Sequence, residues 1–368
     1  MNELGQRIAD LAGRKTIAAD ALGALATAIL ARCGVAEADA RSVAEALVDA
    51  QLRGSQAHGV MHLPAYARGL LEGTINPAPR LQFTAGKDAT AVIDADNGLG
   101  ILAANFAIDR LAPIARRHGI AAAAVRNSNH FGTGSYFVER AASQGLICLG
   151  FSNASPTMAP FGARQPVLGT NPIAAGFPLP GADPIALDMS TSAVARARIR
   201  QAEREGTAIP ADWSLDAEGR PTTDPVAALK GTILPMAGAK GYGLALMAEL
   251  LSSTLSDGRP GFAVASPHES VGAPAGVSHC FIVIDPDGFC GAERQGARAK
   301  AIADRISGLP GIDPASPPRL PGERGHAARR RALKEGIALT PSLSGALAAA
   351  VKLLDERATM RASKGVKA

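Results

Sequence analysis

Between residues 90 and 151, short apolar segments alternate with longer amphipathic ones, and this alternation constrains the fold more than any other feature of the chain. The segments "TAVIDAD", "IAAAAVRN" and "LICLGF" have the length and composition of buried strands. The intervening "ILAANFAIDRLAPIARRHG" and "SYFVERAASQG" carry apolar residues at helical spacing. Strands that alternate with helices indicate an α/β layer architecture, and "IAAGF", "PIALDM" and "SHCFIVIDPDGF" predict further strands.

Both ends of the chain have a helical pattern instead. "AADALGALATAILARCG", "EADARSVAEALVDAQLRG" and "LTPSLSGALAAAVKLL" predict helices, and "MHLPAYARGLLEG" predicts one that starts or kinks at Pro64. "TINPAPR", with two prolines, is typical of a linker. We therefore expect an α/β (α+β) protein with a helical domain of residues 1–80 plus 325–368 and an α/β domain of residues 81–324. The stretches 153–172 and 210–230 lack periodicity and are expected to be irregular.

Composition and charge exclude several functional classes. The chain has 368 residues, 47% of them apolar but only 4% aromatic, so small aliphatic side chains must fill its core. The net charge of +5 comes mostly from "HAARRRALK" and the C-terminal tail, without interleaved aromatics, so we expect no nucleic-acid binding. We expect no signal peptide and no membrane segment. Four widely spaced cysteines without a C-x-x-C motif indicate reduced thiols and a cytoplasmic protein.

The segment "GLGILA" imitates the glycine fingerprint of doubly wound dinucleotide-binding folds. In such folds the next strand ends in an acidic residue that binds the ribose, whereas here the strand ends in Arg126 and Asn127. We therefore interpret "GLGILA" as a tight turn at the start of a helix.

The histidines are the candidates for acid–base chemistry. His130 lies in "VRNSNHFGTGSY", where amide side chains can orient an imidazole, so both a catalytic role and a turn role stay open. His58 and His62 are spaced i, i+4 and could bind zinc, or they could be solvated at a helix end. Because no third ligand lies near them in the sequence, we expect no metal.

Two polar segments predict a phosphate-containing ligand. In "MAGAKGYG", Lys240 and Gly241 open a long apolar helix whose free amides and dipole attract an anion, although a flexible helix start with an exposed lysine is the alternative. "LDMSTS" places Asp188 and three hydroxyls at a strand end, where Ser190 or Thr191 could also be a helix cap. "PGERG" has little specificity by itself.

The order of these segments resembles the malate/L-lactate dehydrogenase family of the second type, which is distinct from the doubly wound lactate and malate dehydrogenases. The similarity extends from about residue 20 to 355. The matching segments are "AHGVMHLPAY", "NSNHFG", "APFGARQPVLGTNPIA", "LDMSTS", "ADWSLDAEGRPTTDP", "GAKGYGLAL" and "PGERG". Members include sulfolactate and ureidoglycolate dehydrogenases, diketogulonate reductase and cyclic-imine carboxylate reductases.

The resemblance implies NAD or NADP as cofactor, a mixed-sheet, non-Rossmann NAD(P)-binding domain, and a homodimer. It implies that His130 or His58 is the catalytic acid/base, with Tyr66 beside the substrate. The long loop through Pro160 and Gly162 would line the cofactor cleft. The implied cofactor-binding residues are Asp188, Met189, Ser190, Lys240, Gly241, Gly322, Glu323, Thr170 and Asn171.

Two positions depart from the family pattern. Ala57 replaces a serine that belongs to a proposed Ser-His-Asp relay in some imine reductases, and His62 replaces an arginine suited to a substrate carboxylate. Arg164 and Arg198 are candidates for that lost carboxylate contact, with His62 remaining at the substrate site. We predict an oxidoreductase that interconverts a small 2-hydroxy acid and 2-oxo acid. The alternatives are a cyclic imino-acid reductase, a cofactor-binding protein with degenerate catalysis, and a zinc-dependent lyase or hydrolase.

Overall fold

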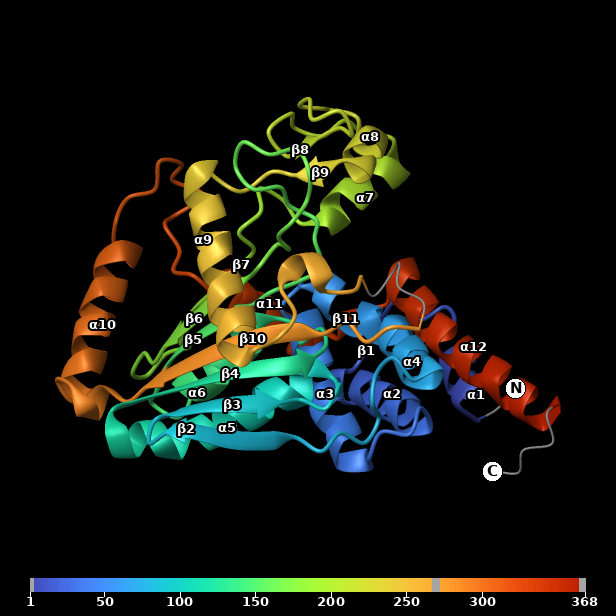
Figure 1. Cartoon of the computed structure of the whole chain (residues 1–368), viewed down its shortest axis with the longest axis horizontal. Helices are drawn as coiled ribbons and strands as arrows, with labels where there is room; N and C mark the ends of the chain where they lie inside the picture. The colour runs from blue at the N-terminus through green and yellow to red at the C-terminus, as the bar shows by residue number, and fades with distance from the viewer. Residues whose placement is uncertain (1–2, 267–271, 364–368) are drawn as a thin grey trace.

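The computed structural model describes residues 3–266 and 272–363, and its centre is a seven-stranded sheet of order β2-β3-β4-β10-β5-β6-β7 (Figure 1). The pair β3–β4 is parallel and all other neighbouring pairs are antiparallel. Doubly wound nucleotide-binding folds have mostly parallel sheets. The expected mixed-sheet, non-Rossmann fold is therefore confirmed. The strands are β2 (Gln82–Lys87), β3 (Thr90–Asp94), β4 (Ile120–Ser128), β5 (Ile147–Ser152), β6 (Ile173–Phe177), β7 (Ile185–Met189) and β10 (Val277–Ile284).

Strand β10 lies in the middle of the sheet, between β4 and β5. Its successive side chains point to opposite faces of the sheet and so contribute to two different cores. Phe281 packs with Phe137 on the face covered by α5 (Gly100–His118) and α6 (Gly134–Ala142). Cys280 faces the opposite side, where it packs with Ala248. On that side α9 (Ala239–Glu249) continues into a π-helical turn, η3 (Leu250–Thr254).

Helices from both chain ends lie together at one end of the sheet (Figure 1). The short strands β1 (Thr16–Ile17) and β11 (Ile337–Ala338) pair with each other and tie these ends together. One continuous core joins this helical layer to the sheet, so the boundaries near residues 80 and 325 stay a prediction. The helices are α1 (Glu3–Ala9), α2 (Ala19–Arg32), α3 (Glu37–Leu52), α4 (Leu63–Glu72), α11 (Glu323–Glu335) and α12 (Pro341–Ser363).

A small lobe stands above the sheet and has a core of its own (Figure 1). It contains α7 (Arg196–Glu205), α8 (Pro225–Lys230) and the paired strands β8 (Ser214–Leu215) and β9 (Thr232–Ile233). The expectation that residues 210–230 are irregular throughout is wrong, because α8 forms there. Pro225 occupies the first turn and the Asp224 carboxylate accepts a hydrogen bond from the Val226 amide, so a six-residue helix is capped locally.

The glycines of "GLGILA" serve helix packing. Gly100 is the first residue of α5, and a Cβ there would lie 2.1 Å from the carbonyl oxygen of Asn129. A side chain at this position would push away the segment that carries His130. This close approach agrees with the interpretation of the segment as a turn rather than a nucleotide fingerprint.

The remaining elements are α10 (Ala292–Ser307) and the short 3-10 turns η1 (Gln56–His58), η2 (Val60–His62), η4 (Gly261–Ala263) and η5 (Pro286–Gly288). All four cysteines are free, and only Cys290 is exposed. None of the described helices combines the length and apolarity needed to cross a membrane.

Candidate active site

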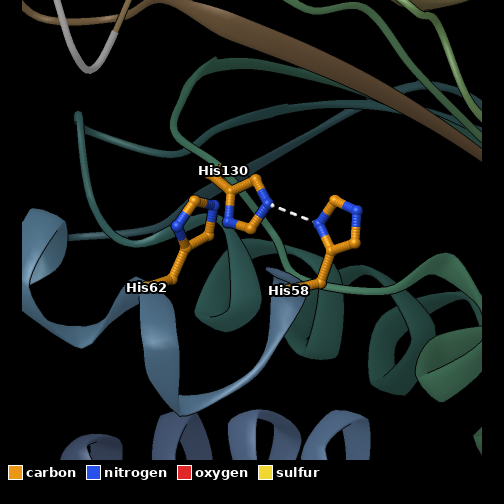
Figure 2. Close-up of side chains that lie close together, drawn as sticks. All are labelled: His58, His62 and His130. Atoms are coloured by element: carbon orange, nitrogen blue, oxygen red, sulfur yellow. Dashed lines mark hydrogen bonds between the residues drawn. The ribbon is translucent and has the colours of Figure 1, made fainter. Parts of the chain in front are cut away.

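Three histidines from two distant stretches of the chain meet at one point (Figure 2), and a tyrosine hydroxyl joins them by a hydrogen bond to one ring. His58 and His62 end the consecutive 3-10 turns η1 and η2, and Tyr66 lies on α4. Gly59 lets these turns approach α3, since a Cβ there would lie 2.9 Å from the Gln51 side-chain oxygen. His130 follows β4 and reaches them from the sheet. The structure therefore brings together four residues that the sequence analysis assigned to catalysis or substrate binding.

His130 is hydrogen-bonded through both ring nitrogens. Its Nε2 lies 3.1 Å from Nδ1 of His58, and its Nδ1 lies 2.7 Å from the hydroxyl of Tyr66. The Tyr66 hydroxyl can also donate to the backbone carbonyl of His130 at 3.2 Å. Burial raises the pKa of Tyr66 well above its usual range, so the hydroxyl keeps its proton. These bonds fix the orientation of the His130 ring, as an acid/base requires.

Asp188 connects the histidines to strand β7. Burial lowers the pKa of His58, and the negative charge of Asp188 opposes this effect. Burial raises the pKa of Asp188, and the backbone amide of Ser135, which donates to its carboxylate at 2.9 Å, opposes that shift. Both side chains are exposed to solvent. The charge of Asp188 thus acts on His58 from a predicted cofactor strand.

A buried histidine that the sequence analysis missed lies beneath the site. His279 of β10 is fully buried, and its ring nitrogens lie 2.8 Å from the Ser152 hydroxyl and 2.9 Å from the Ser128 hydroxyl. Desolvation lowers the pKa of His279 to about 3, so the ring is neutral. His279 thus links the last residue of β4 to the last residue of β5. His130 follows β4, and the loop that contains Asn153 follows β5. A histidine within the apolar run "SHCFIVI" was the available signal.

The histidines line a pocket of about 190 Å³. Its wall also includes Tyr66, Asn153, Ser155 and Thr170, and no lysine or arginine lines it among the described residues. Arg164 and Arg198 are exposed elsewhere, Arg164 beside the lobe and Arg198 on α7. The structure does not bring these two arginines to the pocket.

A buried carboxylate holds the loops around the pocket. Glu249 of α9 accepts hydrogen bonds from the side-chain amides of Asn153 and Asn171, at 3.2 and 3.0 Å, and from the Gly261 amide at 2.8 Å. Asn171 is itself fully buried and also donates to the Ala245 carbonyl. Its side chain therefore faces α9 and does not line the pocket, whereas its neighbour Thr170 does.

The remaining predicted cofactor residues gather around the end of β7. Asp188 and Met189 are its last residues, Ser190 follows, and the Thr191 carbonyl accepts a hydrogen bond from the Met236 amide at 2.9 Å. Lys240 and Gly241 begin α9 a few residues later. On the other side, Gly322 lies against Ala186 of β7 and precedes Glu323, the first residue of α11. Segments separated by up to 135 positions in the sequence thus meet at one edge of the sheet.

The start of α9 suits a phosphate group. The Lys240 side chain is exposed, and within the described part of the chain it forms no ion pair or hydrogen bond. The first amides of a helix have no partner inside the helix, and its dipole favours negative charge there. The residues present therefore fit the phosphates of a dinucleotide.

The histidine cluster changes one inference from the sequence. His58, His62 and His130 each place one ring nitrogen so that all three nitrogens lie within 4.8 Å of one another. The sequence analysis found no third ligand near His58 and His62. His130 fills that place after the chain has folded.

Comparisons with known proteins agree with this arrangement. A family model described as malate/L-lactate dehydrogenase matches residues 17–348. A (2R)-3-sulfolactate dehydrogenase (NADP(+)) of Chromohalobacter salexigens is 39% identical over 306 residues, 83% of this chain and 89% of that protein. Delta(1)-pyrroline-2-carboxylate reductase 2 of Burkholderia multivorans is 33% identical over 326 residues, 88% of this chain and 94% of that protein. The solved structure of sulfolactate dehydrogenase from Methanocaldococcus jannaschii matches with a TM-score of 0.85 and 34% identity, covering 93% of this chain and 97% of that one.

Proposed function

The chain belongs to the malate/L-lactate dehydrogenase family, and on this premise we propose that it interconverts a small 2-oxo acid and the matching 2-hydroxy acid with NAD or NADP. Relatives named sulfolactate dehydrogenase and malate dehydrogenase support this substrate class. The observation that carries the proposal is the hydrogen-bonded series Tyr66–His130–His58 at the wall of a small pocket. The protein is accordingly an NAD(P)-dependent oxidoreductase acting on a CH–OH group.

The chain's own residues supply the proton of this reaction. Reduction of a 2-oxo group adds a hydride to its carbon and a proton to its oxygen. The nicotinamide, when bound, supplies that hydride. His130 donates the proton from Nε2 to the substrate oxygen, while Tyr66 holds the opposite side of the ring. His58 contacts the same Nε2 and has an edge open to solvent, so it can return a proton to His130 after turnover.

The cofactor would be held where the predicted residues gather. Lys240 and the amides at the start of α9, including that of Gly241, would bind its phosphates. Asn171 would act indirectly, by fixing the loop through Glu249. The other contacts would come from Asp188, Met189, Ser190, Thr170, Gly322 and Glu323.

The acid group of the substrate would contact polar side chains of the pocket. His62 stands beside His130, with ring centroids 4.0 Å apart, and Ser155 lines the same pocket. We propose that these two side chains replace the arginine expected for this task. Arg164 and Arg198 lie outside the pocket, and their role as substrate contacts stays a prediction.

A cyclic imino acid is the second candidate substrate, because relatives named pyrroline-2-carboxylate reductases cover most of the chain. Such a substrate needs the same hydride and a proton on nitrogen instead of oxygen. A panel of 2-oxo acids and cyclic imino acids, assayed with NADH and with NADPH, separates the two.

The His130→Gln variant tests the proposal. We expect turnover to fall by about 100-fold or more, because general acid–base catalysis contributes at least that much. The affinity for the nucleotide, measured by calorimetry, should stay the same, since His130 is not one of the predicted cofactor-binding residues. His118→Gln, an exposed histidine at the end of α5, is the matched control. Equal turnover of the two variants would exclude His130 as the proton donor.

We also propose that the protein is a cytoplasmic homodimer. Its cysteines are free and three of them are buried, as is common in a reducing compartment. A groove of about 830 Å³ runs over α2 and α3 and includes Ala24, Ala28 and Val48, and a second copy could cover it. A molar mass near that of one chain in light scattering would exclude the dimer.

A further inference from the structure

We propose that His58, His62 and His130 form a binding site for Zn²⁺ or a similar divalent transition metal, and that a metal bound there blocks proton transfer by His130. The ring nitrogens of the three side chains come within 4.8 Å of one another on one wall of the pocket (Figure 2). The inference about proton transfer rests on the proposed function, whereas the inference about metal binding does not.

The spacing of the nitrogens suits a small tetrahedral ion. Zinc–nitrogen bonds of about 2.0–2.1 Å place two tetrahedral ligand atoms about 3.3 Å apart. His58 Nδ1 and His130 Nε2 are already 3.1 Å apart. One ring nitrogen of each histidine lies within 4.8 Å of one ring nitrogen of both others, so His62 must move its nitrogen closer when the ion binds. His62 already contacts His130, with ring centroids 4.0 Å apart and planes at 90°.

The surroundings favour a tautomer that binds metal. With the proton on Nδ1, His130 donates to the Tyr66 hydroxyl, which in turn donates to the His130 carbonyl. The Nε2 lone pair then points toward His58. Metal-bound histidines commonly have such a partner on their second nitrogen, which orients the ring and raises its basicity. Tyr66 would therefore support the metal site without touching the metal.

The donor set selects the kind of metal. Three imidazoles suit zinc, copper, nickel or iron, whereas magnesium and calcium prefer oxygen ligands. Among the described residues, the lining of this pocket contains no aspartate or glutamate. A metal held by three histidines would keep a fourth position open toward the pocket, for water or an anionic ligand.

Metal binding and catalysis would use the same atom. His130 donates its proton from Nε2, and a metal bound at Nε2 removes that proton and occupies its lone pair. The loaded enzyme can then neither donate a proton to the substrate nor accept one from it. Zinc should therefore inhibit the reaction, and a chelator should restore it.

Equilibrium zinc binding to the whole protein tests the site directly. Protein stripped with a chelator is titrated with Zn²⁺ in competition with a chromophoric chelator, and Mg²⁺ serves as the second ion. We expect one zinc per chain, no competition by Mg²⁺, and an affinity at least about tenfold lower in His62→Gln, since even loss of an outer-shell partner costs that much. His118→Gln should bind like the wild type.

Absence of stoichiometric zinc in the wild-type protein, or equal affinity in His62→Gln, would overturn the site. Thermal melting verifies that each variant is folded, and His58→Gln replaces His62→Gln if the latter is not. Activity is measured on the same samples. Full activity with one zinc bound would overturn the block of proton transfer. Zinc binding by a protein that reduces no substrate of the panel would refute the proposed function and leave the metal site standing.

Discussion

At the scale of single residues, Tyr66 decides what His130 can do. Its hydroxyl meets Nδ1 of the ring at 2.7 Å and the backbone carbonyl of the same residue at 3.2 Å. Tyr66 is almost fully buried, so its position is set by packing as well as by these bonds. The ring of His130 is thus held from the side opposite the nitrogen that faces His58, which makes Tyr66 a positioning residue.

Tyr66→Phe should therefore slow the reaction without loss of the fold. The variant keeps the ring in the core but removes the hydroxyl, which leaves Nδ1 of His130 without this partner. We expect a fall in kcat of about tenfold, smaller than for His130→Gln, because only the orientation of the acid is lost. Stability should fall by about 1 kcal/mol. Steady-state kinetics with urea unfolding gives both values, and an unchanged kcat would contradict the positioning role.

At the scale of elements, the site depends on how closely helix α5 approaches the segment after β4. The Asn129 side-chain amide donates to the Gly98 carbonyl at 2.8 Å, which holds the turn before α5 against the segment carrying His130. Gly100 permits this approach, since any Cβ would overlap the Asn129 carbonyl. The start of α5 thus helps to fix the position of His130.

Gly100→Ala tests this close approach against Gly345→Ala, an exposed glycine inside α12. A Cβ at Gly100 must displace backbone, so we expect a loss of about 1–3 kcal/mol in the free energy of unfolding and a lower kcat. A Cβ at Gly345 meets nothing within 4 Å, and this variant should gain up to about 1 kcal/mol from its higher helix propensity. Similar stabilities of the two variants would show that the contact at Gly100 is not tight.

At the scale of the whole molecule, one ionic network joins the helical ends of the chain to the sheet layer. Arg53, the residue that follows α3, donates two hydrogen bonds of 2.7 Å to Glu139 of α6 and one of 2.6 Å to Asp49. His326 of α11 donates to Glu139 at 2.8 Å. The Arg53 and Glu139 side chains are 13% and 11% exposed, so solvent screens their interaction little.

The network predicts a specific dependence of stability on pH. Burial alone would raise the pKa of Glu139, but the hydrogen bond from His326 and the charge of Arg53 outweigh it and lower that pKa. A carboxylate whose pKa is lowered by folding stabilises the protein above its unfolded pKa, and this contribution is lost as the pH falls through the folded pKa. Glu139 should therefore stabilise the fold at neutral pH and contribute little in strong acid.

Glu139→Gln should destabilise the protein by about 2 kcal/mol near neutral pH, because Arg53 loses one of its two buried carboxylate partners. Urea unfolding of variant and wild type, repeated at acidic pH, should show this difference shrinking as wild-type Glu139 becomes protonated. Glu356→Gln in the exposed pair with Lys352 is the control and should cost less than about 0.5 kcal/mol. A difference that stays constant with pH would mean that the charge of Glu139 is not the stabilising element.

The sequence by itself determined the elements and the chemistry available to them. Periodicity predicted every strand of the central sheet except β2, and the helices α5, α6 and α9 around it, because it reports which face of each element is buried. The absence of an acidic residue after "IAAAAV" already favoured a tight turn over a nucleotide fingerprint for "GLGILA". His130 stood out by its polar neighbours, and the glycines around Lys240 predicted the start of α9. Each of these signals is contained in a short stretch of consecutive residues.

Only the tertiary structure decided which of these pieces meet. Strand β10, from late in the chain, enters the centre of the sheet, and its His279 joins Ser128, 151 residues earlier. His58 and His130 are 72 residues apart and share a hydrogen bond, so the third imidazole beside His58 and His62 was invisible in the sequence. The sequence also did not reveal the small lobe, or that Arg164 and Arg198 lie outside the pocket. Local periodicity shows that one face of an element is buried, but it does not show which other element covers that face. Strand order and helix packing, which only the tertiary structure contains, determine the covering element.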